Sequence, residues 1–350
     1  MTKPMGGRAR GWLLWMWSGA AAAAPQQDAL RPAGIQAERI LSLWHLTLTV
    51  CTAVFVAVLA ALIVAIWRGS RGGETHPRNS QDSGVDLAAA SRADRRSRRM
   101  VAAATWVSVV LLCGLVTADF LTDRALSRLP MDKPLRVEMV GHQWWWETRY
   151  EAEDGRPAFV TANQLQVPVG RPVRVTLKTS DVIHTFWVPN LHGKRDMIPG
   201  RDAAIMLRAD EPGEYRGQCA EFCGAEHALM AFSLRATSSE DYAAWADRES
   251  RDAGTPRDAE LRRGLGVFLG NACAQCHTIR GTSASGTLGP DLTHLASRPL
   301  IAAGTVANTP ENLARWIAEP GAMKPATNMP ATRLQDEDLQ ALVRYLGSLQ

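Results

Sequence analysis

Concentrated positive charge is missing from most of this sequence. The 350 residues carry a net charge of +4, and apart from one arginine-rich stretch the basic residues are scattered along the chain. Proteins that bind nucleic acid gather such residues on one surface, so the sequence predicts no nucleic-acid partner. Apolar blocks alternate instead with long charged stretches, which predicts several units in series rather than a single domain.

Cysteine is also sparse, and its placement is informative. Two of the six cysteines stand alone in apolar runs, and the other four form two close pairs. The isolated residues are Cys51 and Cys113, and the pairs are Cys219 with Cys223 and Cys273 with Cys276. Pairs at such short spacing are typical of disulfides, metal sites or cofactor attachment.

The N-terminal segment has the composition of an export signal. Residues 11–24 are apolar, follow Arg8 and Arg10, and end in small residues before Pro25. The run is too short to span a bilayer comfortably, which predicts a secretory signal peptide over residues 1–24. An uncleaved third anchor is the alternative.

Two later runs are free of charge and long enough to cross a membrane. Residues 40–67 contain no charged side chain and are dominated by Leu, Val, Ala and Ile, which predicts a first transmembrane helix. Residues 101–118 form a second such run, about 27 Å of helix at 1.5 Å per residue, and predict a transmembrane helix over residues 100–120. A buried helix of a soluble domain is the alternative for each.

The loop between these spans, residues 68–99, sets the expected topology. Its arginines are Arg68, Arg71, Arg78, Arg92, Arg95, Arg96, Arg98 and Arg99. Loops rich in positive charge stay on the cytoplasmic side, so both ends of the hairpin face outward. Everything after about residue 122 is therefore expected on the periplasmic side of a bacterial cell membrane, in an oxidising compartment.

The region after Pro130 shows the pattern of short strands. Alternating segments at residues 136–140, 167–169, 173–177 and 230–234 are broken by glycine and proline. Such strands predict a β-sandwich or barrel of roughly 110 residues.

The strongest chemical signal lies near the end of this region. Cys219 and Cys223 are followed by His227 and Met230, and His184 lies upstream. Thiolate, imidazole and thioether form a soft ligand set that favours copper, and a site for one copper ion needs only one cysteine. Two bridging thiolates can hold two copper ions close together and let them share one electron. A disulfide between the two cysteines is the alternative.

This segment and the two membrane spans resemble cytochrome c oxidase subunit II, whose CuA domain is a cupredoxin-like β-sandwich. The resemblance covers residues 30–238 and includes the aromatic segment at 141–146 and the loop at 193–200 that faces subunit I in the family. It implies that the two thiols bridge two copper ions. The implied copper ligands are His184, Cys219, Glu221 through its backbone carbonyl, Cys223, His227 and Met230.

The resemblance implies further roles. The Glu221 carboxylate is expected to reach a magnesium ion shared with subunit I, since magnesium prefers oxygen ligands. Trp144 resembles the exposed residue at which electrons enter, whereas Trp145 and Trp146 are expected on a buried sheet face. Family members often carry an acidic residue before the second span for proton uptake, and Asp94 is the one nearby candidate here.

A second soluble domain is expected after a polar segment. Residues 238–256 are small and charged and predict a linker with a short helix. They are followed by an amphipathic stretch and then by Cys273, Cys276 and His277 in a CxxCH motif. In such a motif two thiols add to the vinyl groups of haem and the histidine binds iron. A redox disulfide is the alternative.

Residues 257–350 resemble a class I cytochrome c domain, which is all-α. Helices are expected at residues 310–319 and 335–348. A thioether as the sixth iron ligand raises the haem potential into the range useful to an oxidase donor. Met329 is predicted to be that ligand, with Met323 as the competitor, and His294 is expected to be a loop or core histidine.

The expected architecture is a two-helix transmembrane hairpin, a cupredoxin-like β-sandwich and an all-α class I cytochrome c domain. The expected segments are a signal peptide at 1–24, transmembrane helices at 40–67 and 100–120, a cytoplasmic loop at 68–99, a CuA domain at 130–237, a linker at 238–256 and a cytochrome c domain at 257–350.

The resemblance implies subunit II of a caa-type oxidase. Such a chain carries electrons from cytochrome c through covalent haem c and CuA to the haem–copper centre of subunit I, coupled to proton translocation. Oxygen reduction is expected in subunit I, because this sequence shows no site for a haem and copper pair. The expected partners are subunit I, subunit III, cytochrome c or a cytochrome bc complex as donor, and membrane lipid.

Other classes of copper protein fit less well. An anchored electron-transfer or copper-handling protein without an oxidase partner is the second hypothesis. Nitrous oxide reductases also have CuA domains, but they carry a propeller of histidine-rich repeats that this sequence lacks, and quinol-oxidising relatives lose the copper ligands.

Overall fold

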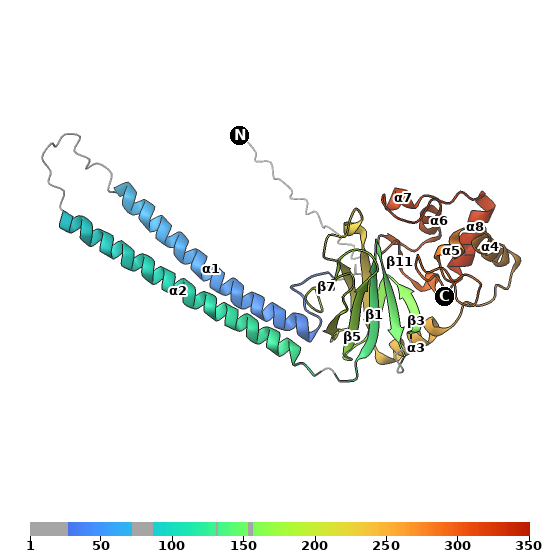
Figure 1. Cartoon of the computed structure of the whole chain (residues 1–350), viewed down its shortest axis with the longest axis horizontal. Helices are drawn as coiled ribbons and strands as arrows, with labels where there is room; N and C mark the ends of the chain where they lie inside the picture. Colours follow the sequence, from blue (N-terminus) through green and yellow to red (C-terminus); the bar gives the residue numbers. More distant parts are fainter. Residues whose placement is uncertain (1–26, 72–86, 131, 153–156) are drawn as a thin grey trace, which may run out of the picture.

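The computed structural model describes residues 27–71, 87–130, 132–152 and 157–350. These residues form a helical hairpin, a two-sheet β domain and a helical C-terminal domain, so the predicted fold class is confirmed (Figure 1). The predicted signal peptide lies outside the described residues, as does the part of the predicted cytoplasmic loop between residues 71 and 87.

The hairpin consists of two long helices with exposed apolar side chains. Helix α1 spans Ile35–Arg71 and helix α2 spans Leu87–Ser127, and they lie side by side (Figure 1). Each holds a stretch long and apolar enough to cross a bilayer, Ile35–Ser70 and Asp94–Ser127, and none of the most apolar window of either is buried. Apolar surface of this extent is stable in lipid rather than in water.

Helix α2 begins well before the predicted second span. Residues 87–99, assigned from the sequence to a loop, are helical because alanine and arginine are good helix formers. Asp94 forms an ion pair with Arg98 one turn later, at 2.7 Å. The acidic side chain singled out for proton uptake therefore has a basic partner on its own helix.

The β domain is a sandwich of two five-stranded sheets, with strand orders β3-β2-β1-β5-β8 and β4-β10-β9-β6-β7. The strands are β1 Leu135–His142, β2 Trp145–Glu151, β3 Pro157–Ala162, β4 Gln164–Pro168, β5 Val173–Thr179, β6 His184–Trp187, β7 Arg195–Met197, β8 Ala203–Leu207, β9 Gly213–Cys219 and β10 Ala231–Thr237. Strands β1, β4, β5 and β10 fall where the sequence predicted strands. In β1, Val137 and Met139 are buried and Arg136 is exposed, as the alternating pattern requires.

Strand pairing brings three loops to one end of the sandwich. Within the second sheet, Phe186 of β6 pairs with Cys219 at the end of β9, and Gln218 pairs with Ala231 at the start of β10. The first sheet contributes Gly141 near the end of β1, where a β-carbon would touch the ring of His184. Loops that are distant in sequence therefore share a small volume at this end.

The start of the hairpin is tied to the sandwich by backbone hydrogen bonds. The amide of Ala33 donates to the carbonyl of Asn190 at 2.7 Å, and the amide of Ala37 donates to Leu191 at 3.1 Å. A β-carbon at Gly34 would come within 2.3 Å of the Arg208 carbonyl oxygen, so this approach requires glycine. The apolar hairpin and the β domain are thus held together at their junction.

The segment predicted as a linker folds largely as a helix. Helix α3, Ser239–Ser250, begins at Ser238, whose side chain accepts a hydrogen bond from the amide of Asp241 at 3.0 Å. Its Trp245 is buried, with its ring 5.2 Å from that of Tyr150 and 5.4 Å from that of Phe159. The sequence suggested a polar connector because Trp245 is isolated among charged and small residues, but in the fold this ring completes the core of the sandwich.

The C-terminal domain surrounds a second apolar core. Its elements are α4 Ala259–Gly270, α5 Cys273–Cys276, η2 Leu295–Ser297, β11 Leu300–Ile301, β12 Val306–Ala307, α6 Pro310–Ala318, α7 Pro320–Met323 and α8 Asp336–Gly347. Helix α4 crosses α8, and α6 and α8 lie at the two sites predicted for helices. Asp258 and Thr309 cap α4 and α6 by accepting hydrogen bonds from backbone amides.

Candidate functional site

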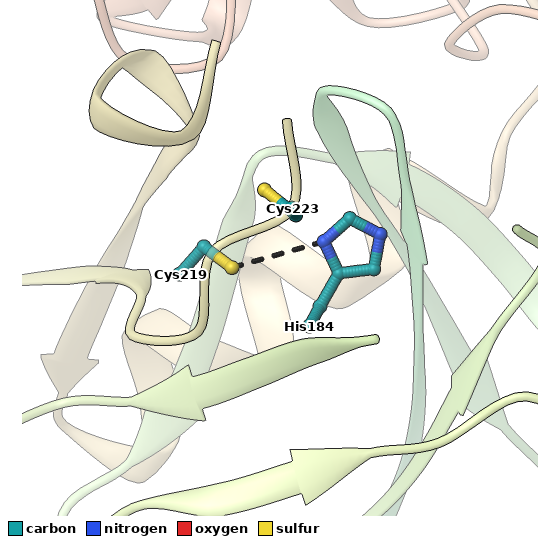
Figure 2. A group of neighbouring side chains, drawn as sticks. All are labelled: His184, Cys219 and Cys223. Atoms are coloured by element: carbon teal, nitrogen blue, oxygen red, sulfur yellow. Dashed lines mark hydrogen bonds between the residues drawn. The ribbon is translucent and has the colours of Figure 1, made fainter. Parts of the chain in front are cut away.

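The end of the sandwich where the three loops meet gathers the sulfur and imidazole groups predicted from the sequence. His184 begins β6, Cys219 ends β9, and Cys223 lies in the following loop. All three side chains are buried, and their ligand atoms lie within 4.8 Å of one another. Figure 2 shows the two sulfur atoms beside the imidazole, with 3.7 Å between the Cys219 sulfur and Nδ1 of His184.

The same loop supplies two more candidate ligands. Nδ1 of His227 lies 3.6 Å from the sulfur of Cys223, and the thioether sulfur of Met230 lies 3.8 Å from that same atom. His227 opens the short helix η1, His227–Leu229, which turns the chain so that Met230 points back into the buried cluster. Both residues therefore lie beside Cys223, while His184 lies beside Cys219.

Glu221 contributes through its backbone and presents its side chain to solvent. Its carbonyl oxygen lies 3.2 Å from the Cys219 sulfur, whereas the residue as a whole is exposed. The carbonyl and the carboxylate of this one residue therefore face different surroundings.

Two residues outside the predicted set orient His184. The carboxylate of Asp181 accepts a hydrogen bond from Nε2 of His184 at 2.9 Å, which leaves Nδ1 free of hydrogen and directed at sulfur. Gly141 makes room for the ring, because a β-carbon there would lie 2.8 Å from its Cδ2 atom. The ring orientation is therefore fixed by two residues that lie outside the metal-ligand motif.

The two thiols and His184 shift one another's pKa values. The neighbouring Cys223 thiol and then His184 lower the pKa of Cys219 to about 3 against the effect of burial, and Cys219 in turn raises the pKa of Cys223. Burial lowers the pKa of His184, but Cys219 and Asp181 outweigh it and raise that pKa. Of the two neighbouring thiols, Cys219 is therefore the more acidic, and both thiols are unbridged in the structure.

The donor set fits soft metal ions. Each of two imidazole nitrogens and one thioether sulfur lies within 3.8 Å of one of the two thiol sulfurs, and such sulfur and nitrogen ligands favour copper over hard cations. The hydrogen bond from Nε2 of His184 to Asp181 orients the imidazole. Histidines that bind metals generally make such a hydrogen bond through their other ring nitrogen.

The three tryptophans take different positions. Trp146 is fully buried, as predicted, with its ring 5.2 Å from Phe232. Trp145 is only half-buried, stacked on His142 at 4.3 Å, because successive side chains of β2 point to opposite faces. Trp144 is half-buried rather than exposed, and its indole N–H donates to the carbonyl of Cys223 at 3.0 Å.

A second candidate site is a cavity of about 450 Å³ in the C-terminal domain. Cys273, Cys276 and His277 line it, as does Met329, whereas Met323 does not. Helix α5 presents the two thiols, and His277 follows the helix directly. The four residues predicted to hold haem therefore face one cavity.

His277 is held in one protonation state and orientation. Its Nδ1 donates a hydrogen bond to the carbonyl of Pro290 at 2.8 Å, which leaves Nε2 as the atom that can bind a metal. Burial lowers the pKa of His277, so the ring is neutral. Gly289 leaves space for the ring, since a β-carbon there would lie 2.6 Å from its Cε1 atom.

A buried cation on the cavity wall also fits haem. Arg298 is 6% exposed, and its Nη2 donates to the Asp291 carbonyl at 2.6 Å, but its Nε has no hydrogen-bond partner among the described residues. Haem carries carboxylate groups that a buried guanidinium can pair with. The cavity therefore offers two thiols, an oriented imidazole, a thioether and a compensating charge, which together fit a haem c.

His294 lies away from this cavity and has another partner. It is 3% exposed, and its Nε2 lies 3.0 Å from the carbonyl of Arg251 after α3. This position agrees with the sequence-based expectation of a core histidine. It also joins the C-terminal domain to the end of helix α3.

Several contributors were missed by sequence reasoning. Asp181 carried a weak signal, since an acidic residue three positions before a candidate ligand can support it. Arg298 and Gly141 carried none, because nothing local marks a position that will face a distant ring or cavity. Glu226 beside His227 and Lys324 near Met329 were visible in the sequence, but only the fold shows that they meet.

Comparison with known proteins matches the two soluble domains to two families. The family described as cytochrome c oxidase subunit II, periplasmic domain, matches residues 151–237, and the cytochrome c family matches residues 261–350. Cytochrome c oxidase subunit 2 of Alkalihalophilus pseudofirmus is 33% identical over 333 residues, 92% of this chain and 90% of that protein. The Bacillus subtilis protein of the same name is 30% identical over 267 residues, 70% of this chain and 74% of that protein.

One solved structure is similar to part of the chain. The periplasmic domain of subunit II of the Bradyrhizobium japonicum cytochrome oxidase is 30% identical and aligns with 34% of this chain and 96% of that chain, with a TM-score of 0.32. The relative that is 33% identical over 92% of this chain, together with the two matched domains, establishes the assignment. The chain belongs to the cytochrome c oxidase subunit II family, in a form that carries a cytochrome c domain after its periplasmic domain.

Proposed function

We propose that this chain accepts electrons at a covalently bound haem c, passes them to a binuclear copper centre, and delivers them to the oxygen-reducing haem–copper centre of subunit I, coupled to proton translocation. The observation that supports the proposal is that one chain brings together two sets of candidate ligands. One set lies at the end of the sandwich and the other lines the cavity of the C-terminal domain.

The copper set is proposed residue by residue. Cys219 and Cys223 would bridge the two ions, because their sulfurs occupy the centre of the cluster. His184 and Met230 would complete one site, and His227 with the Glu221 carbonyl the other. Bound copper would supply a one-electron carrier whose charge is shared between two ions. The protein's part is to hold the donors rigidly and away from water, which His184 and Met230, both fully buried, support.

Haem attachment is proposed at the CxxCH motif. Cys273 and Cys276 would form thioether bonds, and His277 and Met329 would bind iron from the two sides of the ring. The hydrogen bond from His277 to Pro290 supports the orientation of the first ligand. A methionine as the second ligand would hold the haem potential high enough to receive electrons from a cytochrome donor.

Magnesium binding by Glu221 and electron transfer through Trp144 are proposed from the family resemblance. The exposed Glu221 carboxylate would bind magnesium at the boundary with subunit I. The nearby segment at residues 193–200 borders a charged surface hollow of about 490 Å³ that includes Lys194, Asp196 and Arg201, and it would face the same subunit. Trp144 would mediate electron transfer into the copper centre, supported by its hydrogen bond to the Cys223 carbonyl.

The proposed partners rest on membership of the family, and the proposed orientation in the membrane rests on the apolar hairpin and its arginine-rich loop. Subunit I is the partner implied by membership of the family, and subunit III, a cytochrome c or cytochrome bc donor and membrane lipid are proposed in addition. The proposed orientation places residues 130–237 and 257–350 outside the cytoplasmic membrane. The arginine-rich segment between the two spans would remain inside.

Copper analysis and electron paramagnetic resonance on the complex purified from native membranes test the central proposal. We expect two copper ions per chain and a hyperfine pattern from one electron shared between two nuclei. Cys273→Ser should abolish covalent haem on a haem-stained gel while the copper signal remains. Cys219→Ser should abolish the copper signal while covalent haem remains. One copper ion per chain with a mononuclear signal would contradict the binuclear centre, and purification without subunit I would contradict the oxidase role.

A further inference from the structure

The two soluble domains meet at the end of the sandwich that carries the candidate copper ligands. On one side of the contact, the carbonyl of Ala303 accepts a hydrogen bond from the amide of Ala231 at 3.1 Å. On the other side, Asn328 donates to the carbonyl of Gln143 at 3.0 Å. The cavity of the C-terminal domain opens toward this contact, since His142, Gln143, Trp144 and Trp145 form part of its lining.

A buried ion pair lies at the centre of this contact. Nζ of Lys324 lies 3.4 Å from Oε2 of Glu226, and the two residues are only 3% and 2% exposed. Lys324 also donates to the carbonyl of Trp144 at 3.0 Å, and Oε1 of Glu226 accepts from the amide of Ala326 at 2.9 Å. Each charged residue thus reaches into the other domain.

The pair is sensitive to loss of either partner. Among the described residues, Oε2 of Glu226 has no hydrogen bond, so the ammonium of Lys324 is its compensating charge. Removing one member of a buried pair leaves the other charge uncompensated in a medium of low polarity. Separating the domains would relieve that penalty by returning the remaining charge to water.

The position of the pair couples it to both redox sites. Glu226 directly precedes the proposed copper ligand His227, and Lys324 lies on the segment that leads to the proposed haem ligand Met329. The carbonyl that Lys324 binds belongs to Trp144, whose indole donates to Cys223. Because electron transfer slows steeply with distance, a contact at this point controls the rate between the centres.

We propose that the Lys324–Glu226 pair is the positioning contact that docks the cytochrome domain on the copper domain and so sets the rate of electron transfer from haem to copper. This inference rests on the proposed function of the two sites. The domain would stay tethered without the pair, because Arg280 donates to the carbonyl of Ser250 at 3.1 Å at the end of α3. Loss of the pair should therefore slow transfer rather than abolish it.

The test compares Lys324→Met, Glu226→Gln and the exchange Lys324→Glu with Glu226→Lys in the intact oxidase complex. Arg333→Met, at an exposed basic residue of the same domain, is the matched control. Stopped-flow absorbance should show haem-to-copper transfer slowed by about tenfold or more in Lys324→Met, because the docked population falls while the tether keeps the domain nearby. The copper spectrum and the haem content should remain those of the wild type. Because Lys324 also lines the cavity proposed for haem, the haem potential is measured in every variant, and the rates are compared after correction for any change in it.

Rescue separates positioning from a local structural effect. The exchanged pair should restore only part of the rate lost in the single variants, because the opposite charges meet again while the contacts to the Trp144 carbonyl and the Ala326 amide are lost. Lys324→Met lies in the other domain from the copper ligands, so it tests the contact even if Glu226→Gln alters the copper spectrum. Haem-to-copper transfer at the wild-type rate in Lys324→Met would overturn the inference. Slow transfer in the exchanged variant, together with an altered copper spectrum, would also overturn it. Absence of haem-to-copper transfer in the wild-type complex would instead contradict the proposed function.

Discussion

Asp181 fixes the ring of His184 from outside the metal-ligand motif. Its carboxylate accepts the Nε2 hydrogen at 2.9 Å, and Nδ1 then faces the Cys219 sulfur at 3.7 Å. Asp181 also accepts hydrogen bonds from the amides of Gln143 and Val182, both at 2.6 Å. The loop that carries the ring and the turn that carries Trp144 are thus held by one carboxylate.

Replacement of that carboxylate should weaken copper binding. We expect Asp181→Asn to lower copper affinity about 10- to 100-fold, since the amide keeps the shape but loses the charge that supports the imidazole. Competition with a copper chelator, followed by the optical spectrum of the centre, measures the change. Glu240→Gln, at an exposed acidic residue of α3, is the control. Equal chelator sensitivity in Asp181→Asn and wild type would show that the hydrogen bond does not support the ligand.

The crossing of α4 and α8 depends on one glycine and not on its neighbour. A β-carbon at Gly264 would lie 2.1 Å from the Ala341 carbonyl oxygen, whereas one at Gly266 would meet nothing within 4 Å. Gly264→Ala should destabilise the cytochrome domain by about 1–3 kcal/mol through overpacking. Gly266→Ala should be neutral or stabilise it by about 0.5–1 kcal/mol through helix propensity. Thermal unfolding followed at the haem band compares the two, and equal midpoints would refute the close crossing.

The identity of the distal iron ligand can be read from the haem potential. Met329→His should lower the potential, because imidazole in place of a thioether no longer favours the reduced state. Met323→His is the matched control, since Met323 does not line the cavity, and it should leave the potential unchanged. Redox titration of the haem band in both variants gives the answer. A fall in the Met323 variant alone would move the ligand assignment to Met323.

Acid should destabilise the β domain in part through His192. Burial lowers the pKa of His192 to about 4 from 6.5, so the folded protein holds this ring neutral while the unfolded chain protonates it. The unfolded state therefore binds more protons, and stability falls as pH drops from 6.5 toward 4. The loss from this residue is at most about 3 kcal/mol. His192→Gln should show a shallower decrease of the unfolding midpoint over that pH window, and parallel decreases would contradict the assignment.

The sequence alone determined the features whose parts lie close together along the chain. The CxxCH motif, the Cys219 to Met230 loop and the two charge-free runs each occupy one segment, so spacing and composition were enough to predict their chemistry. Helices α4, α6 and α8 were predictable for the same reason, because amphipathic periodicity and end signals are local.

Only the tertiary structure decided which distant residues meet. Lys324 lies 180 positions from Trp144, and Ala326 lies 100 positions from Glu226, yet both pairs are hydrogen-bonded. In the sequence Trp245 lies in a polar segment predicted as a linker, whereas in the fold its ring packs against Tyr150 of the sandwich. Such contacts depend on which surfaces remain exposed after each domain has folded. A local sequence pattern does not show which surfaces these are. The candidate ligands could therefore be named from the sequence, whereas the contact between the two soluble domains could not.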